Sequence, residues 1–450
     1  MLRDHLDVLR CPRSGQRLTL EVTESAGDDV VFGLLSSDAG TYPVVSGIPV
    51  FTAAGRRAVD EVRAGRTLRA TAEAFCATAD GPRSRRIAAA MSHSAALRGT
   101  VRLAGETLRR REVDAATELL GRADLGVLDI LGGAFPSGRA TMQDAHAYFR
   151  FRLGTPRHLV VLSVLEALPE PSGLVGDFGC GAGHLTWAVA RRWPSARVVA
   201  MDLDFRLLLA ARLMVGPGHA LVCADITRTP VASGSFEHTI SSDVLSYVED
   251  KWSVVREMER TLSVEGVLTV TSVKDAAAEH VFAGDPISVS AWRGLVEHLE
   301  HRVLADDQIL ARYHDGKGLP VDDFEPVPGA GQNVTLVASR RRLDLSGDWA
   351  LLGWPHARGE LGLNPLYRPA GGGTYERALP AGVYAKDNPA LEDYLPPTVR
   401  LDAATLAAAR RGERPAALDA LVATTAVLAY PDAYNPDRWP APSPDGSARP

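Results

Sequence analysis

A glycine-rich turn between an apolar run and an amphipathic stretch constrains the fold of this chain more than any other feature. The turn begins at the end of the largely apolar run 174–178 and precedes the helix-like stretch 185–193. Its sequence is Asp177-Phe178-Gly179-Cys180-Gly181-Ala182-Gly183. Glycines in such a turn let the backbone bend without a Cβ clash and let it approach a ligand closely. The pattern therefore predicts a strand, a ligand-binding loop and a helix in succession.

The region around this turn alternates short apolar runs with amphipathic stretches. Strands are predicted at 174–178, 197–201, 220–224, 238–242, 267–273 and 333–339, and helices at 185–193, 205–215, 252–262 and 291–303. This alternation is typical of βαβ units around a parallel sheet. We therefore expect a doubly wound, Rossmann-like α/β domain.

Shifts in composition divide the 450-residue chain into four predicted parts. They are a small β-rich module over 1–52, a helical linker or lid over 53–140, the α/β domain over 141–342 and an irregular extension over 343–450. The last ~12 residues are rich in Pro and Ser, a composition that favours disorder.

The overall composition argues against several classes of protein. Hydrophobic residues make up 46% and charged residues 23%, as in ordinary globular proteins. A formal net charge of −6 argues against a broad nucleic-acid-binding surface. No apolar run approaches the ~20 residues of a membrane-spanning helix, and no signal peptide is visible. The four cysteines are dispersed, so we expect a cytoplasmic protein without a disulfide framework or a metal site.

The spacing of the glycines distinguishes between cofactors. Gly179, Gly181 and Gly183 form G-x-G-x-G, and the next residue is His184. The dinucleotide pattern G-x-G-x-x-G therefore fails at its third glycine, which a pyrophosphate site uses for close helix–strand packing. The spacing favours a cofactor without a pyrophosphate.

Two carboxylates follow the next two predicted strands. Asp202 ends the second strand, and Asp225 follows the third. The first can accept hydrogen bonds from both ribose hydroxyls of an adenosine moiety, and the second can accept from the adenine amino group while the Ile226 N–H meets a ring nitrogen. Either carboxylate could instead cap a helix or a loop. Because both lie with the glycine turn at the carboxyl ends of consecutive strands, we favour an adenosine-containing cofactor.

Residues 174–273 resemble the class I S-adenosylmethionine (SAM)-dependent methyltransferase family. The resemblance lies in the segments 175–183, 199–204, 223–225, 235–245 and 262–268. It implies a seven-stranded sheet with an antiparallel last strand, and SAM as the cofactor. It also implies that Asp177 and the three loop glycines contact the methionyl part of SAM, Asp202 its ribose and Asp225 its adenine.

Further cofactor contacts are expected from residues beside these positions. Leu203 follows Asp202, and Ser242 ends the fourth predicted strand. Arg150 belongs to the aromatic–arginine cluster 148–152, one arginine of which could pair with the SAM carboxylate. The alternative is that this cluster is an amphipathic helix with a solvated arginine face.

Methyl transfer requires alignment and a matched pocket, and a general base only for some acceptors. The candidate catalytic residues are His280 after the fifth strand, His314, which Asp315 could orient, and Tyr247 after the fourth strand. Tyr247 stands where family members with Leu-x-His have histidine, which puts the acid–base role of that position in doubt. His184 could face the substrate or simply pack against or cap its helix.

The N-terminal segment has a resemblance of its own. The runs 6–12 and 42–49, which contain Cys11-Pro12 and Tyr42-Pro43, resemble the small Trm112-like family. Many members carry a second cysteine shortly after the Cys-Pro pair, where this chain has Ser14. We therefore expect a structural or lid module without zinc.

Three functions remain open at this point. The first is methyl transfer from SAM to a small-molecule acceptor, with a natural-product intermediate as one candidate. The second is an rRNA or tRNA methyltransferase, because some rRNA guanine methyltransferases also place a small Cys-Pro module before the catalytic domain. The third is a SAM-fold binding or partner protein without methyl transfer. The oligomeric state is left open.

Overall fold

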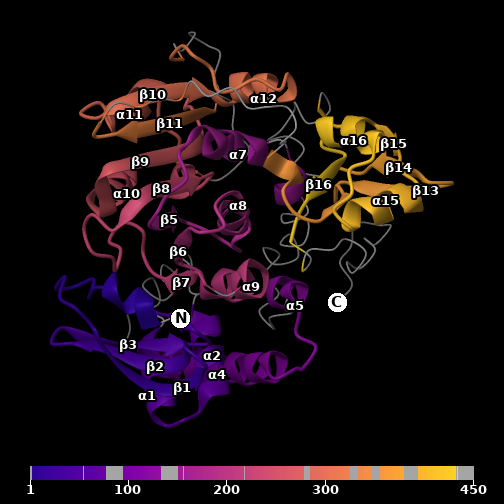
Figure 1. Ribbon diagram of the computed structural model, residues 1–450. Coiled ribbons are helices and arrows are strands. Elements are labelled where there is room, and N and C mark those ends of the chain that lie inside the picture. The colour runs from indigo at the N-terminus through magenta and orange to yellow at the C-terminus, as the bar shows by residue number, and fades with distance from the viewer. Residues whose placement is uncertain are drawn as a thin grey trace. The chain divides into compact units, whose positions relative to one another are not determined.

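The structure is a computed structural model that describes residues 3–53, 55–77, 95–132, 151–155, 157–216, 218–277, 284–324, 333–341, 355–379 and 394–431, with residues 343, 345 and 433 (Figure 1). Its contacts divide the chain into two compact units. The first unit comprises 1–142, 181–183 and 199–232, and the second comprises 143–180, 184–198 and 233–450.

Seven strands form one mixed sheet in the order β10-β11-β9-β8-β5-β6-β7. In that order their bounds are Glu300–Ala305, Val334–Ser339, Leu262–Val273, Phe236–Ser242, Leu174–Phe178, Arg197–Asp202 and Ala220–Cys223. β5, β8 and β9 pair in parallel, as do β6 and β7, whereas β11 runs antiparallel to both of its neighbours. The predicted Rossmann-like fold with an antiparallel last strand is confirmed.

Helices cover the sheet, and in the second unit α10 and α11 lie on one side of the strands while α7 and α8 lie on the other (Figure 1). The helices that accompany the strands are α7 (Arg157–Ala167), α8 (His184–Arg192), α9 (Phe205–Val215), α10 (Lys251–Thr261), α11 (Val289–Gly294) and α12 (Asp306–His314). α10 shows why they form. Asp250 caps its first turn by accepting a 3.0 Å hydrogen bond from the Ser253 N–H, and Val254 and Met258 bury one face.

The helix predicted over 291–303 is wrong in its second half. α11 ends at Gly294, and β10 begins at Glu300 and pairs with β11. The apolar residues at 296, 299 and 303 match a helical period, but antiparallel pairing places Val303 opposite Leu336 inside the sheet. Long-range strand pairing, which local spacing does not report, decided this element.

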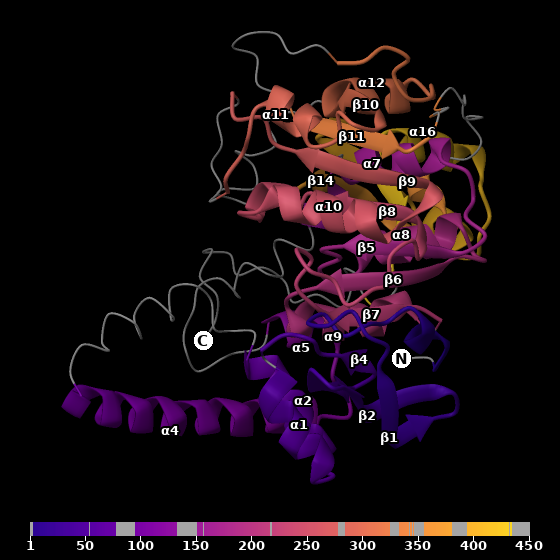
Figure 2. The same ribbon diagram turned by 90° about the vertical axis from the view of Figure 1, so that its left-hand side faces the viewer.

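The first unit contains a four-stranded antiparallel sheet in the order β1-β2-β3-β4. Its strands span Thr19–Ala26, Asp29–Ser37, Gly40–Val45 and Ile48–Pro49, after the short helix η1 (Arg3–Asp7). The helices α1 (Gly55–Arg63), α2 (Thr67–Ala77), α4 (Ala95–Leu120) and α5 (Val127–Gly132) follow. Figure 2 shows α4 as a long helix whose N-terminal end projects away from α1 and α2 and whose C-terminal end lies beside them.

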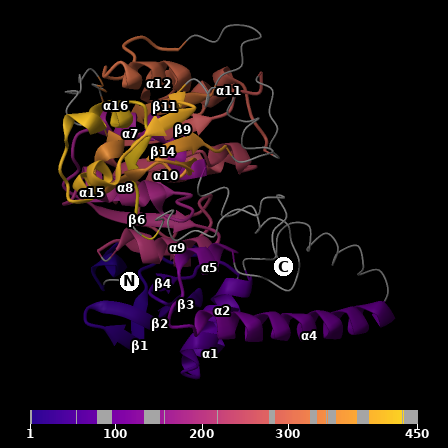
Figure 3. The ribbon, with the colours of Figure 1, turned by 90° about the vertical axis from the view of Figure 1, so that its right-hand side faces the viewer.

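The C-terminal extension, predicted to be irregular, has more regular structure than its sequence suggested. Its elements are η5 (Pro355–Ala357), β12 (Leu361–Leu363), β13 (Tyr367–Gly371), β14 (Thr374–Arg377), β15 (Thr398–Arg400), α15 (Ala403–Arg410), η6 (Ala416–Leu418), α16 (Asp419–Ala423) and β16 (Val427–Ala429). They gather on one side of the second unit, beside α7 and α8 (Figure 3). A small core of Phe151, Leu366, Tyr367 and Leu395 joins the extension to the residues before α7. The last ~12 residues, predicted to be disordered, lie outside the described residues.

Within the described part of the chain, no helix combines the length and the apolar character that crossing a bilayer requires.

Candidate functional site

The glycine loop after β5 adopts backbone conformations that favour glycine. Gly179, Gly181 and Gly183 have φ values of +81°, +54° and +83°. A Cβ at Gly179 would lie 2.6 Å from the Cγ1 of Val244, whereas a Cβ at Gly181 would meet no atom within 4 Å. The backbone at Gly181 therefore faces open space that a ligand can enter.

Asp177 fixes the start of this loop. It lies near the end of β5, is 1% exposed, and accepts a 2.6 Å hydrogen bond from the Thr186 hydroxyl on α8. The strand and the helix that flank the loop are thereby joined by a buried polar contact, which holds the loop in a defined shape.

Asp202, at the end of β6, carries the best-positioned carboxylate of the site. Its Oδ2 accepts a 2.8 Å hydrogen bond from the Gly181 N–H, and its Oδ1 accepts a 2.9 Å bond from the Asp204 N–H. Burial raises the pKa of Asp202 to about 6, against the opposing effect of these backbone hydrogen bonds. Each carboxylate oxygen keeps a second lone pair for a ligand hydroxyl.

The other residues expected at the adenosine lie along the same unit. The Ala224 N–H donates to the Asp202 carbonyl oxygen at 2.9 Å, so the segment after β7 begins beside Asp202. Asp225 is exposed, and its Oδ1 accepts from the Thr227 N–H at 2.9 Å. The next residue, Ile226, is buried, and Leu203 is 57% exposed.

In the second unit, the end of β8 meets a buried arginine. Arg152 is 4% exposed; its Nη1 donates to the Asp243 Oδ2 at 2.8 Å, and its Nη2 lies 3.4 Å from both the carbonyl oxygen and the hydroxyl of Ser242. Asp243 holds a left-handed conformation with φ of +58°. The sequence singled out Arg150 of this cluster, which lies outside the described residues. Nothing in the local pattern distinguished Arg152, because only its tertiary partners mark it.

The same arginine defines the state of His184, the first residue of α8. The Arg152 Nε–H donates to the His184 Nε2 at 2.9 Å, so Nε2 is the acceptor and Nδ1 carries the proton of the neutral ring. Burial, with the charge of Arg152, holds the pKa of His184 well below its usual range. His184 is therefore a neutral side chain of fixed orientation. Its Nε2 lone pair is occupied by the Arg152 hydrogen bond, so this atom does not act as a base.

The catalytic candidates have different surroundings. Tyr247 lies in the short helix η3 (Leu245–Tyr247), is 52% exposed, and has the Lys274 Nζ 6.0 Å from its ring centroid. His314 ends α12, where its Nδ1 lies 3.3 Å from the Ala423 carbonyl oxygen and its ring stacks on Tyr394 at 4.7 Å. His280 lies outside the described residues. The catalytic roles of all three stay predictions.

Cys11 of the N-terminal sheet region has hydroxyl groups around its sulfur. Its Sγ lies 3.4 Å from the Tyr42 hydroxyl oxygen. Burial raises the thiol pKa, but hydrogen bonds from Ser14, Ser37 and Tyr42 together lower it to about 6. Among the residues that the structure describes, no group of three or more His, Cys, Asp or Glu side chains is arranged to hold a metal ion.

Comparison with known proteins gives a family match over the same region. Residues 176–270 match a family described as a methyltransferase domain. The chain is 34% identical over 99 residues to a malonyl-[acyl-carrier protein] O-methyltransferase of Legionella pneumophila, which covers 22% of this chain and 35% of that protein. It is 31% identical over 127 residues to a trans-aconitate 2-methyltransferase of Rhodopseudomonas palustris, which covers 28% and 48% of the two chains.

The family match covers the glycine loop and the strands from β5 to β9 but not β10 and β11, and the chain spans less than half the length of these two relatives. A malonyl-[acyl-carrier protein] O-methyltransferase of Laribacter hongkongensis is 28% identical over 197 residues, and the chain spans 66% of its length. Among solved structures, geranyl diphosphate C-methyltransferase of Streptomyces coelicolor matches with a TM-score of 0.31 and 14% identity, over 40% of this chain and 74% of that one. At that TM-score the likeness adds nothing to the assignment of the fold.

Proposed function

We propose that this chain, whose residues 176–270 belong to the class I SAM-dependent methyltransferase family, transfers a methyl group from SAM to a small-molecule acceptor. The observation that carries the proposal is the contact between the glycine loop and the strand-end carboxylate of Asp202. A loop that is open at Gly181 and a half-buried acidic group beside it suit an adenosine-containing cofactor without a pyrophosphate.

The residues present fit this cofactor. Asp202 would accept hydrogen bonds from the ribose hydroxyls, because both of its oxygens keep an acceptor site beyond the backbone N–H groups that they already bind. Asp225 would accept from the adenine amino group, and the Ile226 N–H would donate to a ring nitrogen. When bound, SAM supplies a sulfonium methyl group as the electrophile.

The methionyl end of SAM would lie at the glycine loop. Asp177 and Gly179 would border that part of the site. Arg152 would supply the positive charge that was predicted for Arg150, and Ser242 would supply a polar group, as predicted. The Asp243 carboxylate already accepts a hydrogen bond from the Arg152 guanidinium. This bond fixes the orientation of the other N–H groups of Arg152. The chain therefore holds its cationic group in place before the cofactor arrives.

The C-terminal extension would help to form the acceptor side. The Asn364 Nδ2 donates to the Gly154 carbonyl oxygen at 3.1 Å, two residues from Arg152. A Cβ at Gly154 would collide with both Asn364 and Leu366, so the extension packs tightly on this turn. An acceptor pocket built by such an added segment suits a specialised metabolite, and we propose a natural-product intermediate as the acceptor.

Calorimetry with S-adenosylhomocysteine tests the cofactor. The wild-type protein is expected to bind, and Asp202→Ala is expected to bind at least ~10-fold more weakly, because a hydrogen bond to a charged group contributes ~1.5–3 kcal/mol. Asp250→Ala is the matched control, since it removes the cap of α10 and no predicted cofactor contact. Absence of binding to the wild-type protein would overturn the proposal.

The acceptor class needs its own assay. Transfer of a labelled methyl group to a panel of small carboxylic acids and thioesters, beginning with trans-aconitate and a malonyl thioester, should give a product with the wild-type protein. Salt-dependent retention on RNA, together with methylation of RNA and of no small molecule, would instead favour the hypothesis of an rRNA or tRNA methyltransferase. Cofactor binding without transfer to either class would leave a binding protein.

A further inference from the structure

The segment 223–232, which carries Asp225 and Ile226, is held at its start by residues that follow the N-terminal sheet. Val50 forms a parallel bridge with Cys223, and the Phe51 N–H donates to the Cys223 carbonyl oxygen at 2.8 Å. β7 is an edge strand of the seven-stranded sheet, at the end opposite β10. These contacts therefore cover an edge that would otherwise present unpaired backbone groups.

The same segment is held at its end by residues just before the N-terminal sheet. The Arg10 N–H donates to the Pro230 carbonyl oxygen at 2.8 Å, and the Ala232 N–H donates to the Val8 carbonyl oxygen at 2.9 Å. Between these bonds, Leu9 forms an antiparallel bridge with Val231, and both side chains are buried at 0% and 1% exposure. Residues 8–10 therefore act as a short added strand beside 230–232.

Side chains extend the attachment toward the ribose end of the site. The Cys223 Sγ donates to the Leu203 carbonyl oxygen at 3.5 Å and lies 3.9 Å from the Thr52 hydroxyl. Burial raises the pKa of Cys223, so the sulfur stays a thiol donor. A line of contacts thus runs from Thr52 through Cys223 to the residue that follows Asp202.

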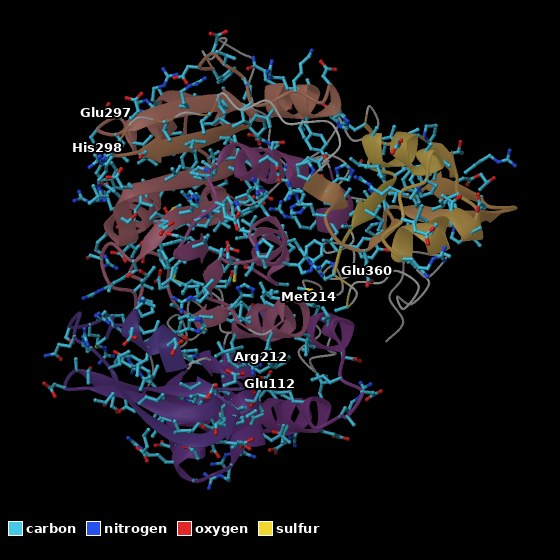
Figure 4. All side chains as sticks on the ribbon, in the orientation of Figure 1. Glu112, Arg212, Met214, Glu297, His298 and Glu360 are labelled. Atoms are coloured by element: carbon cyan, nitrogen blue, oxygen red, sulfur yellow. The ribbon has the colours of Figure 1, made fainter. Side chains whose placement is uncertain are left out.

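The N-terminal sheet is also attached to α9, the helix that follows Asp202. Arg212 of α9, labelled in Figure 4, places its Nη2 2.7 Å from the Asp29 Oδ2. A Cβ at Gly47 would collide with the Arg212 guanidinium, so the turn between β3 and β4 packs directly on that side chain. The attachment therefore involves a helix, a strand and a loop of the same unit.

Anchoring of this kind has an energetic consequence for a ligand that contacts the segment. Ordering a loop residue costs ~1–2 kcal/mol of backbone entropy. A segment that is already fixed at both ends does not incur that cost when a ligand binds. The protein therefore binds the ligand more tightly than it would with a mobile segment. Between its attached ends, the segment has a further bond to the module, because the Arg228 Nη2 donates to the Arg13 carbonyl oxygen at 3.1 Å. Near Asp225 the contact is local, since the Thr227 hydroxyl donates to the Asp225 Oδ1 at 2.7 Å.

We propose that residues 3–52, the N-terminal module, are a positioning element for the purine end of the cofactor site. The module holds segment 223–232 so that Asp225 and Ile226 are in place before the cofactor binds. This inference rests on the proposed SAM site. It gives the module a part in cofactor affinity, in place of recognition of a metal or a nucleic acid.

The test compares two leucine truncations within the module. Leu9→Ala removes the side chain that faces Val231, whereas Leu35→Ala removes an equally buried side chain within the N-terminal sheet. Calorimetry is done with S-adenosylhomocysteine and with adenosine at a temperature where circular dichroism shows both variants folded. Leu9→Ala is expected to bind both ligands ~5- to 50-fold more weakly, which corresponds to ~1–2.3 kcal/mol, and Leu35→Ala to bind as the wild type does.

Hydrogen exchange supplies a second readout. The amides of 223–232 are expected to exchange faster in Leu9→Ala than in Leu35→Ala, and ligand is expected to slow them again. Val231→Ala, a smaller truncation on the other side of the bridge, replaces Leu9→Ala if that variant does not fold and should show the same pattern.

The outcomes separate the two ideas. If the wild-type protein fails to bind S-adenosylhomocysteine, the proposed function fails. If the wild type binds and Leu9→Ala binds equally well, or if both leucine variants lose the same affinity, the positioning role is overturned while the proposed function stands.

Discussion

The Gly181 N–H donates to the Asp202 carboxylate across 2.8 Å, and this bond joins two features that lie 21 positions apart in the chain. The glycine is there because the loop needs a positive φ, and the carboxylate is there because β6 ends beside the loop. A second amide, from Asp204, binds the other carboxylate oxygen, so the acidic group has a fixed orientation. The carboxylate proposed to bind the ribose is therefore held in place by the backbone.

The first prediction concerns pH and Asp202. The folded-state pKa of about 6 lies above the ordinary value, so the unfolded chain loses this proton first as pH rises. The stability that this group contributes is fully present below its ordinary pKa of 3.8 and is lost as pH rises through the folded-state pKa of about 6. Affinity for S-adenosylhomocysteine should change in the opposite direction and strengthen between about pH 5 and pH 7, because the ionised carboxylate accepts the ribose hydroxyls better.

Calorimetry across that pH range checks the prediction, with Asp202→Asn as the control. The asparagine variant cannot ionise at this position, so its weaker binding should be nearly independent of pH. Equal pH dependence in both proteins would assign the effect to another group.

The second prediction concerns Gly179. Gly179→Ala forces a Cβ to within 2.6 Å of the Val244 side chain at a φ of +81°. The loss of stability should exceed that of Gly234→Ala, whose φ of +69° is similar but whose Cβ would meet open space, by ~1–3 kcal/mol. Chemical denaturation measures both, and the double variant Gly179→Ala/Val244→Ala should recover part of the difference. A loss equal to that of Gly234→Ala would show that backbone strain alone is responsible.

The third prediction concerns the ring of His184. Nitrogen-15 NMR should show a neutral imidazole with the proton on Nδ1 between about pH 5 and pH 8. Arg152→Met removes the nearby charge and the donor to Nε2, so the His184 pKa should rise, although burial keeps it below its usual range. The same variant leaves Asp243 with one of its two described ion-pair partners, Arg157, and should cost ~3–5 kcal/mol of stability. A protonated ring at pH 7 in the wild type would contradict the hydrogen bond assigned here.

The fourth prediction concerns Asn364, which attaches the C-terminal extension. It is fully buried; its Nδ2 donates to the Gly154 and Thr425 carbonyl oxygens at 3.1 and 2.9 Å, and its Oδ1 accepts from the Leu366 N–H. Asn364→Ala leaves these backbone groups without their side-chain partner and should lower the free energy of unfolding by ~2–4 kcal/mol in denaturation. The exposed control Gln308→Ala should lower it by at most ~0.5 kcal/mol. A loss no larger than the control's would mean that the extension is held mainly by its apolar core.

Local pattern was sufficient wherever one period and one turn type dominated. The strand 174–178 and the helix 205–215 match their predicted bounds. The strand is a short buried run that ends at a glycine turn, and the helix is capped by Asp204 and stopped by Gly216. The same reasoning failed at 300–305, where apolar spacing fits a helix and pairing with β11 makes a strand.

By itself, the sequence determined the Rossmann-like core, the glycine loop and the acidic residues at the ends of its strands, because these depend on short-range spacing and on where parallel strands end. Only the tertiary structure decided that Arg152 is buried against His184 and Asp243. It also decided that residues 8–10 and 50–51 bind segment 223–232. Those contacts join backbone and side-chain groups that are distant in the chain, and such partners leave no period, motif or turn signal in the sequence.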